Sequence, residues 1–271
     1  VRTAPVDFGA LWAIRPPLIG FTEGCGFVAS DERGEMGRYA QPEGLYADTL
    51  RFALFDGTGR FERWLAEVPT ETRGWHSRDG GFGTVNLVFG RRRIAVLSEE
   101  DLLIAITDSL AWTRVSLEGA VIGRKALSTQ RRAVHRADID SERQRLIDSV
   151  RVYWGAGRPG ITPVLARRFV THGTEAIETV PAETTFPAFD RATPGTNGVV
   201  WVRLYPRPRD AMARWLALDR DGRVLGELSL PVASTVAAAS HDWIVVLERD
   251  AFDAPLLRIL AIEGGIGSEG E

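Results

Sequence analysis

The histidines and the acidic residues at glycine-rich turns are the side chains in this sequence best suited to catalysis or metal binding. The four histidines lie far apart in the sequence: His76, His135, His172 and His241. None of the HxH, HExxH or HxxxH spacings that hold a metal ion occurs among them. The turn at 219–222 is shorter than a calcium loop, which supplies several oxygen ligands at fixed intervals. We therefore predict no catalytic residues, no metal site and no bound cofactor.

A run of three arginines is the most concentrated charge in the chain. The run stands between Phe89 and Ile94 and consists of Arg91, Arg92 and Arg93. Guanidinium groups suit bidentate pairing with carboxylates and phosphates, so this run is a candidate contact for an acidic partner. The alternative is a solvated turn whose arginines pair with the nearby acidic residues 99–101. Both interpretations stay open at the level of sequence.

The first 25 residues form a candidate arm that contacts a partner. Pro5, Pro16 and Pro17 exclude a long helix here. The segment is dense in large apolar side chains: Phe8, Leu11, Trp12, Ile14, Leu18, Ile19 and Phe21. It is either a first strand and its connection, packed on the body of the protein, or an apolar arm that lies on another molecule.

Six of the eight tryptophans fall into two groups according to their positions. Four lie on predicted strands and are expected in the core: Trp112, Trp201, Trp215 and Trp243. Trp12 and Trp75 lie in predicted loops, where an aromatic side chain is a candidate anchor for a partner's pocket.

Three segments share one pattern and define the elements that position these residues. The segments are 50–65, 112–127 and 213–228, and each has an apolar run, an acidic-glycine turn and a second apolar run. Glycine readily adopts the positive φ of a tight turn, so each segment predicts a β-hairpin. Recurring hairpins are typical of stacked or radially arrayed sheets.

Residues 128–185 interrupt the strand pattern. Apolar residues at helical spacing predict a helix over 141–154, with Asp140 or Ser141 as its N-cap. A second short helix is predicted over 163–170, with Gly173 as its C-cap. This region is expected to be a helical insert in a β array.

The segment from Phe186 onward resembles the last blades of a bacterial six-bladed β-propeller family of NHL/TolB type. The matching residues are 186–189, 197–205 (NGVVWVRLY), 214–231 (RWLALDRDGRVLGELSLP) and 241–250 (HDWIVVLERD). Members of such a family have six sheets of roughly 40–50 residues each. The spacing of the repeated turns in this chain leaves room for only three or four sheets.

We therefore predict a mainly β protein, a partial β-propeller of three to four antiparallel sheets with a short helical insert. The expected organisation is an N-terminal arm (1–25), first blades (26–127), the helical insert and its connection (128–185), C-terminal blades (186–263) and a tail (264–271). An open array leaves an apolar sheet face and unpaired edges at its ends, and something must cover them.

The composition of the chain limits the range of functions that it can have. The net charge of −3 gives no basic field for nucleic acid, and no run approaches the ~20 apolar residues of a membrane-spanning helix. Cys25 is the only cysteine, which excludes a disulfide framework. With no catalytic pattern, we expect a structural or protein-binding subunit of a larger bacterial assembly, peripheral to the extracytoplasmic (periplasmic) face of a membrane. The alternatives are a stand-alone binder of small ligands or peptides and a metal-dependent hydrolase.

Overall fold

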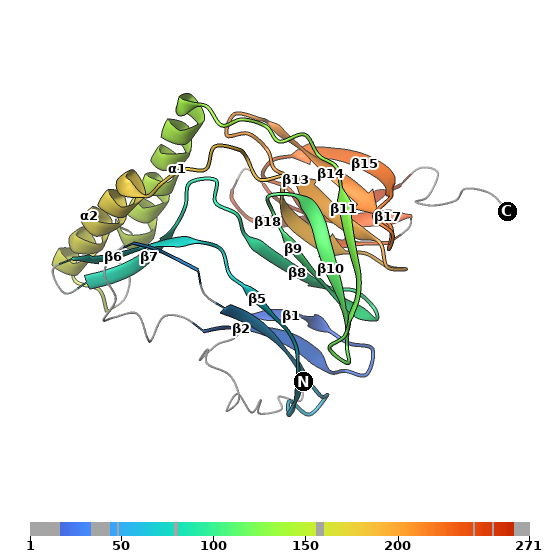
Figure 1. Cartoon of the computed structure of the whole chain (residues 1–271). Helices are drawn as coiled ribbons and strands as arrows, with labels where there is room; N and C mark the ends of the chain where they lie inside the picture. Colours follow the sequence, from blue (N-terminus) through green and yellow to red (C-terminus); the bar gives the residue numbers. More distant parts are fainter. Residues whose placement is uncertain are drawn as a thin grey trace.

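The computed structural model describes residues 17–33, 44–47, 49–78, 81–155, 160–240, 242–250 and 252–262, with the backbone alone for Arg33 and for residues 75–78 and 81–84. These residues form five antiparallel sheets of three or four strands and two helices (Figure 1). Four of the sheets follow one another along the chain as blades, and the helices interrupt the array between the second and third blades. The predicted mainly β, partial propeller of antiparallel sheets with a helical insert is confirmed; the fifth sheet exceeds the predicted three to four.

The four blades account for most of the strands. Blade 1 consists of β1 (Leu18–Phe21), β2 (Phe27–Arg33), β4 (Thr49–Phe55) and β5 (Phe61–Pro69). Blade 2 consists of β8 (Arg93–Leu97), β9 (Asp101–Ile106), β10 (Leu110–Ser116) and β11 (Val121–Leu127). Blade 3 consists of β12 (Phe189–Pro194), β13 (Val200–Leu204), β14 (Met212–Leu218) and β15 (Val224–Pro231). Blade 4 consists of β16 (Thr235–Ala239), β17 (Trp243–Arg249) and β18 (Pro255–Ala261).

The blades are arranged around a common axis through their first strands. β1 lies beside β8, β8 beside β12, and β12 beside β16. Each junction between blades is an apolar core in which one sheet face packs on the next. Trp215 is fully buried in the junction of blades 3 and 4, and Trp201 lies with it, as predicted for both. Apolar packing between faces, which dominates folding free energy, therefore holds the array together.

One turn geometry recurs at the end of each blade. In the turn from β14 to β15, the Asp219 carboxylate accepts from the Arg223 N–H at 2.8 Å, and Gly222 has a φ of 81°. Gly59 and Gly119 hold the same left-handed position in blades 1 and 2. The three predicted hairpins are confirmed. Blade 4 repeats the turn with Asp253, at a φ of 62°, in the position of the glycine.

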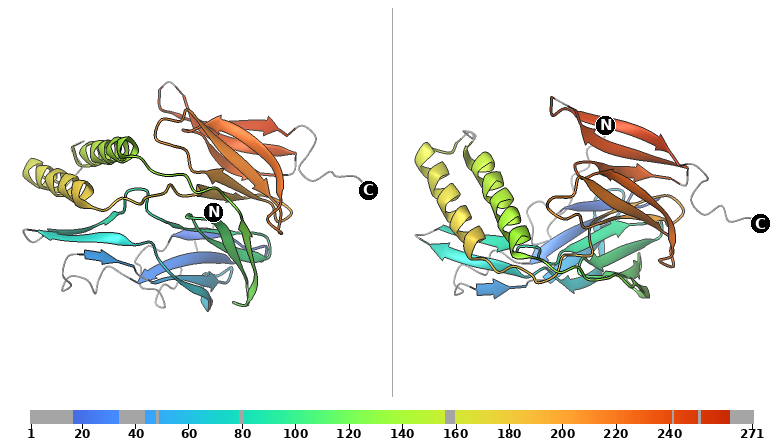
Figure 2. Two further views of the ribbon diagram at one scale, coloured as in Figure 1. Left: turned by 45° about the horizontal axis from the view of Figure 1, so that its top comes forward. Right: turned by 90° about the horizontal axis from the view of Figure 1, so that it is seen from above.

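The helical insert consists of α1 (Arg136–Gly155) and α2 (Pro163–Thr179), which lie side by side (Figure 2). α1 begins earlier than predicted, because the carboxylate of Asp138 accepts from the His135 N–H at 3.0 Å and stabilises the first turn. The expected caps Asp140 and Ser141 are therefore inside the helix. Gly173 is not a C-cap, because α2 continues through it to Thr179.

Crossing backbone segments fix the base of the helices. Val88 N–H donates to the Pro181 carbonyl at 3.1 Å, and Phe186 N–H donates to the Arg132 carbonyl at 2.9 Å. Phe89, Phe186 and Tyr205 form an aromatic cluster at the same place. A small sheet of β3 (Gly44–Tyr46), β6 (Arg73–Arg78) and β7 (Gly81–Asn86) lies near α2. The helices thus project from a fixed base beside the blades.

Candidate functional site

The predicted contact residues of the N-terminal arm fall on both sides of the boundary of the described structure. Leu18, Ile19 and Phe21 lie on β1, where Leu18 and Phe21 are exposed and Ile19 packs into the core between blades 1 and 2. The predicted contacts that lie outside the described residues are Phe8, Leu11, Trp12 and Ile14. The prediction that Trp75 lies in a loop is wrong, because its backbone belongs to strand β6, between β3 and β7; its side chain is not among those described.

The three consecutive arginines have three different environments. Arg91 pairs with Asp108 at 3.2 Å, and Arg93 donates through Nε to the Pro69 carbonyl at 2.7 Å. Among the described residues, the Arg92 guanidinium has no hydrogen-bond or ion-pair partner. The expected pairing of these arginines with residues 99–101 is wrong, because Glu99 and Glu100 pair with Arg220 and Asp101 pairs with Arg114.

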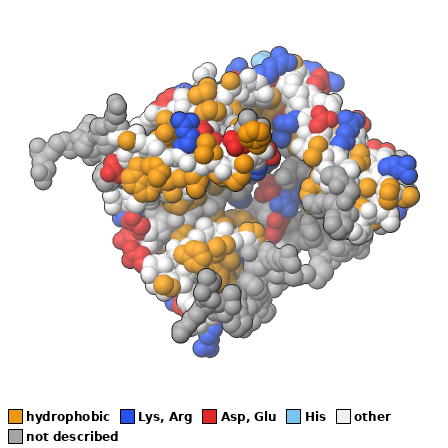
Figure 3. All heavy atoms as spheres, turned by 180° about the vertical axis from the view of Figure 1, so that it is seen from behind, with side chains coloured by type: hydrophobic (Ala, Val, Ile, Leu, Met, Phe, Trp, Pro, Cys, Tyr) orange, Lys and Arg blue, Asp and Glu red, His pale blue; other side chains and the backbone are white. Residues whose placement is uncertain are grey.

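The outer face of blade 4 is the largest departure from the predicted core. Direct cross-strand pairs between β17 and β18 place the members of this open face together: Trp243, Val245, Leu247, Leu257, Ile259 and Ala261. Trp243, Leu247, Leu257 and Ile259 are 38%, 39%, 64% and 75% exposed, respectively. The prediction that Trp243 is a core residue is wrong. Figure 3 shows hydrophobic side chains gathered over this part of the molecule.

The opposite face of blade 4 shows why the open face is exposed. Ile244 and Val246 alternate with the open-face residues along β17, and both are buried against blade 3. A strand points successive side chains to opposite faces, and both faces of β17 are apolar. Such a sequence is typical of a blade that has a neighbour on each side, but the described residues supply a neighbour on one side only.

Blade 1, at the other end of the array, differs from blade 4. Its outward face carries a ladder of aromatic rings, with Phe27 and Phe55 stacked at 4.8 Å and Phe61 packed edge-on against Phe55. Phe55 and Ala53 on this face are fully buried. Of the two terminal blades, blade 4 is therefore the one that leaves a wide apolar face open to solvent.

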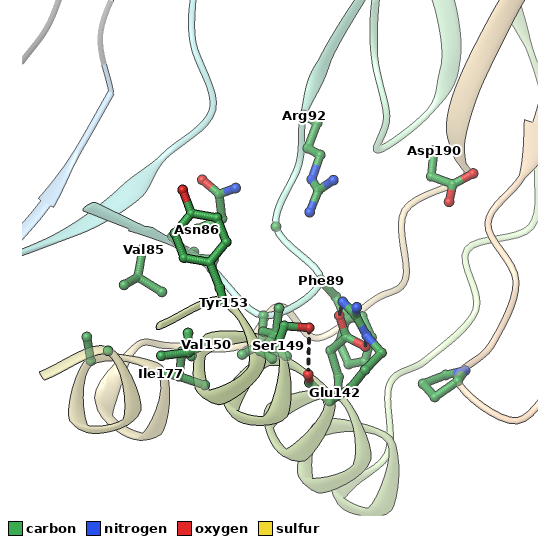
Figure 4. Close-up of a pocket in the computed structure, with 18 of the residues that line it drawn as sticks. Val85, Asn86, Phe89, Arg92, Glu142, Ser149, Val150, Tyr153, Ile177 and Asp190 are labelled. Atoms are coloured by element: carbon green, nitrogen blue, oxygen red, sulfur yellow. Dashed lines mark hydrogen bonds and ion pairs between the residues drawn. The ribbon is translucent and has the colours of Figure 1, made fainter. Parts of the chain in front are cut away.

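A cleft of about 1440 Å³ lies between the helices and blades 2 and 3. Figure 4 shows Ser149 and Tyr153 of α1 on one wall and Arg92, from the loop before β8, and Asp190 of β12 on the other. Val150, Leu146 and Phe169 add apolar surface to the helical wall. The cleft thus combines an apolar wall from the helices with a charged wall at the start of the first strands of two blades.

Arginine is in excess over acidic residues in this cleft. Six arginines line it: Arg92, Arg145, Arg168, Arg191, Arg203 and Arg207. The three acidic residues are Glu142, Glu175 and Asp190. Two of these acids are committed to salt bridges: Glu142 pairs with Arg145 at 2.6 Å, and Asp190 pairs with Arg203 at 2.5 Å.

The excess of arginine affects the pKa values of side chains at the charged wall. Burial lowers the pKa of Arg191, and the neighbouring Arg203 and Arg92 guanidiniums lower that pKa further, against the opposing effect of Asp190. Burial also raises the pKa of the Tyr205 hydroxyl, which therefore stays protonated at neutral pH. Like charges that face one another in a partly buried site favour the entry of an anion.

The described residues contain no group of three or more His, Cys, Asp or Glu placed to hold a metal ion. Glycines 155, 157 and 160 match the spacing of a dinucleotide-binding turn, but Gly155 ends a helix, whereas that turn follows a strand.

No protein-family model matches this sequence, and comparison with curated proteins gives no match. The resemblance to six-bladed propellers therefore remains a prediction. No helix among the described residues is long and apolar enough to cross a membrane.

The sequence indicates only some of the residues of the cleft and of the open face. Arg92 was found because it stands in a run of arginines, whereas Arg191 is a single arginine that tertiary structure brings near it. The open face had a readable signal in the apolar residues at both parities of 243–247 and 256–260. That pattern predicts a strand buried on both faces, and it cannot tell whether the second neighbour belongs to the same chain.

Proposed function

We propose that this chain is a non-catalytic, protein-binding subunit of a larger assembly and that the open face of blade 4 is its docking surface. One observation carries the proposal: four large apolar side chains are exposed together on a sheet face whose counterparts in the inner blades are buried. Contiguous exposed apolar surface of this kind marks interaction sites on soluble proteins.

The occupant that fits this surface is a different protein that presents an apolar β-sheet face or strand. The three blade junctions within the chain all consist of apolar sheet faces packed together, so the same chemistry continues naturally across the open face. Blade 4 also has three strands where the other blades have four, and β18 is its edge. An incoming strand could therefore hydrogen-bond to β18 while its sheet covers Leu257 and Ile259.

The edge of β18 has little protection against such pairing. Natural edge strands are commonly blunted by lysine, proline or inward-pointing charge. In β18, Pro255 stands only at the first position, and the single charge is Arg258, which is on the face opposite Leu257 and Ile259 and is ion-paired with Glu248 at 3.3 Å. The open-face positions 257, 259 and 261 carry no charge and no proline. The strand therefore remains suitable for pairing along most of its length.

The test compares matched pairs of substitutions. The double variant Leu257→Asp/Ile259→Asp places two charges on the open face. Val121→Asp/Ile122→Asp places two charges on the exposed outer strand of blade 2 and serves as its control. We expect the wild-type chain and the control to bind the uncharged dye Nile red equally, and the open-face variant to bind clearly less of it while keeping its circular dichroism spectrum.

A partner is tested in producing cells with a photo-crosslinking amino acid at position 259 or at position 122. A distinct adduct from position 259 alone, lost when Leu257→Asp is added, supports docking at the open face. A wild-type chain that binds no dye, or equal behaviour of both double variants, contradicts the proposal. A stable dimer of the chain alone would assign the face to a second copy.

We further propose that the assembly is peripheral to the extracytoplasmic face of a bacterial membrane. This location rests on the sequence resemblance to bacterial propellers. Cell fractionation with protease added to intact spheroplasts tests it: digestion of the chain from outside is expected, and protection until the cells are lysed would contradict this location.

A further inference from the structure

We propose that the cleft between the helices and blades 2 and 3 is a binding site for a small amphipathic anion, which carries a carboxylate or phosphate on an apolar body. The charged group would lie between Arg92 and Arg191, and the apolar body would lie along α1. This site is separate from the open face of blade 4, so either proposal can fail without the other.

The positions of the two arginines support an anion site. Arg92 precedes β8 and Arg191 lies near the start of β12, so both stand at the same end of neighbouring first strands near the axis of the array. Arg92 has no hydrogen-bond or ion-pair partner among the described residues. Arg191 donates through Nη1 to the hydroxyl of Thr235 at 3.0 Å, a neutral partner that holds its guanidinium in place. Most of the donors of both guanidiniums are therefore available to a ligand.

The acidic residues of the charged wall do not neutralise these two arginines. The carboxylate of Asp190 is engaged in a two-point interaction with Arg203, with Nε–Oδ1 at 2.8 Å and Nη2–Oδ2 at 2.5 Å. Arg203 also donates to the Val232 carbonyl at 3.1 Å, which fixes this pair in the wall. Glu142 is similarly bound by two nitrogens of Arg145. The third acid of the cleft, Glu175, lies on α2 in the helical wall. With both Asp190 and Glu142 held in ion pairs, Arg92 and Arg191 form a cationic pair suited to an external anion.

The helical wall indicates that the ligand has an apolar part. Leu146, Val150 and Tyr153 line the cleft at successive turns of α1, and Phe169 adds a ring from α2. The Trp154 and Phe169 rings pack together at a tilt of 34°, with centroids 4.3 Å apart, which adds aromatic support to this wall. At about 1440 Å³ the cleft is also far larger than an inorganic phosphate ion requires. Sites of this size hold organic ligands, with apolar walls for the body and a few polar groups for orientation.

The experiment uses 2-naphthoate as an anionic probe, 1-naphthyl phosphate as its phosphate counterpart and 2-naphthylmethanol as the neutral counterpart. Binding is measured by isothermal titration calorimetry on the full chain. We expect the two anions to bind at least tenfold more tightly than the alcohol, since hydrogen bonds to charged groups are the stronger ones. Raising the salt concentration from 50 to 500 mM is expected to weaken the binding of the anions and leave that of the alcohol unchanged.

Variants locate the site. Arg92→Ala and Arg191→Ala are each expected to weaken anion binding by about tenfold, in line with the loss of one charge-assisted hydrogen bond. Arg124→Ala, on the exposed outer strand of blade 2 and outside the cleft, is the matched control and is expected to bind as the wild type does. Tyr153→Ser is expected to weaken both the anions and the alcohol, because it shortens the apolar wall.

The outcomes distinguish a phosphate ligand from a carboxylate ligand. They also distinguish failure of the cleft proposal from failure of the open-face proposal. Tighter binding of 1-naphthyl phosphate than of 2-naphthoate assigns a phosphate ligand, and the reverse assigns a carboxylate. The open-face variant Leu257→Asp/Ile259→Asp is expected to keep full anion binding. Equal affinity for the anions and the alcohol, or unchanged anion binding in Arg92→Ala, whose guanidinium makes no hydrogen bond or ion pair among the described residues, overturns the proposal.

Discussion

At the residue scale, Asp253 holds a backbone conformation that the other blade turns give to glycine. Its φ of 62° lies in the left-handed region, while Gly59, Gly119 and Gly222 have φ values of 85°, 90° and 81°. Any residue with a Cβ atom is strained there, although Asp tolerates it better than most. The sequence repeat was therefore found in blades 1 to 3 and missed in blade 4, because its signal was the glycine.

This difference predicts that Asp253→Gly stabilises the protein by about 0.5–1 kcal/mol, or about 1–3 °C in the thermal midpoint. The substitution removes an ion pair between Arg249 and Asp253 at 3.2 Å, but both side chains are largely exposed and such pairs contribute little. Asp253→Ala is the control, since it removes the same ion pair without relieving the backbone. Thermal denaturation that shows equal midpoints for Asp253→Gly and Asp253→Ala would contradict the argument.

At the element scale, the close approach of α1 and α2 depends on Gly173. A Cβ atom at this position would lie 2.9 Å from Cγ1 of Val150, closer than such atoms pack. Glycine in the middle of a helix normally costs about 1 kcal/mol relative to alanine. The sequence signal for a helix end at Gly173 was therefore misleading, because this glycine serves contact between helices rather than a turn.

We accordingly expect Gly173→Ala to destabilise the protein by about 1 kcal/mol, although the same change stabilises most exposed helices. Val150→Ala in the same chain removes the clashing methyl groups and is expected to make Gly173→Ala neutral or favourable. A double-mutant cycle followed by chemical denaturation measures this coupling. Additive effects of the two substitutions would show that the helices are not limited by this contact.

Sequence predicted the elements unevenly, for physical reasons. The strands of the blades were visible because each alternates or concentrates β-branched and aromatic residues between turns. The small sheet was largely missed: Trp75 was predicted to lie in a loop, but it belongs to β6, which pairs with β3 and β7. Glycine-rich strands such as β7 have weak propensity, so their pairing depends on neighbours that a local pattern does not contain. The cleft was unpredictable for the same reason, since its walls come from segments far apart in the chain.

At the scale of the whole molecule, the two ends of the blade array are unequal. Phe55 and Ala53 on the outward face of blade 1 are fully buried, whereas Leu257 and Ile259 on the outward face of blade 4 are exposed. An array with an exposed apolar face at each end would assemble head to tail. Such heterologous contacts produce filaments unless they close into a ring. An array with one open face has a single docking surface of this type, so its assembly ends once that surface is covered.

The asymmetry predicts a finite complex with one partner bound per chain through blade 4. The full chain is affinity-tagged, purified from cells that produce its partner and measured by native mass spectrometry. We expect a single additional protein, bound in a fixed one-to-one ratio. The variant Leu257→Asp/Ile259→Asp should release that protein, because two charges buried against an apolar sheet carry a large desolvation cost. The control Val121→Asp/Ile122→Asp should retain it. A ladder of masses that grows with concentration would instead mean that blade 1 also binds, and would refute the single-surface assembly.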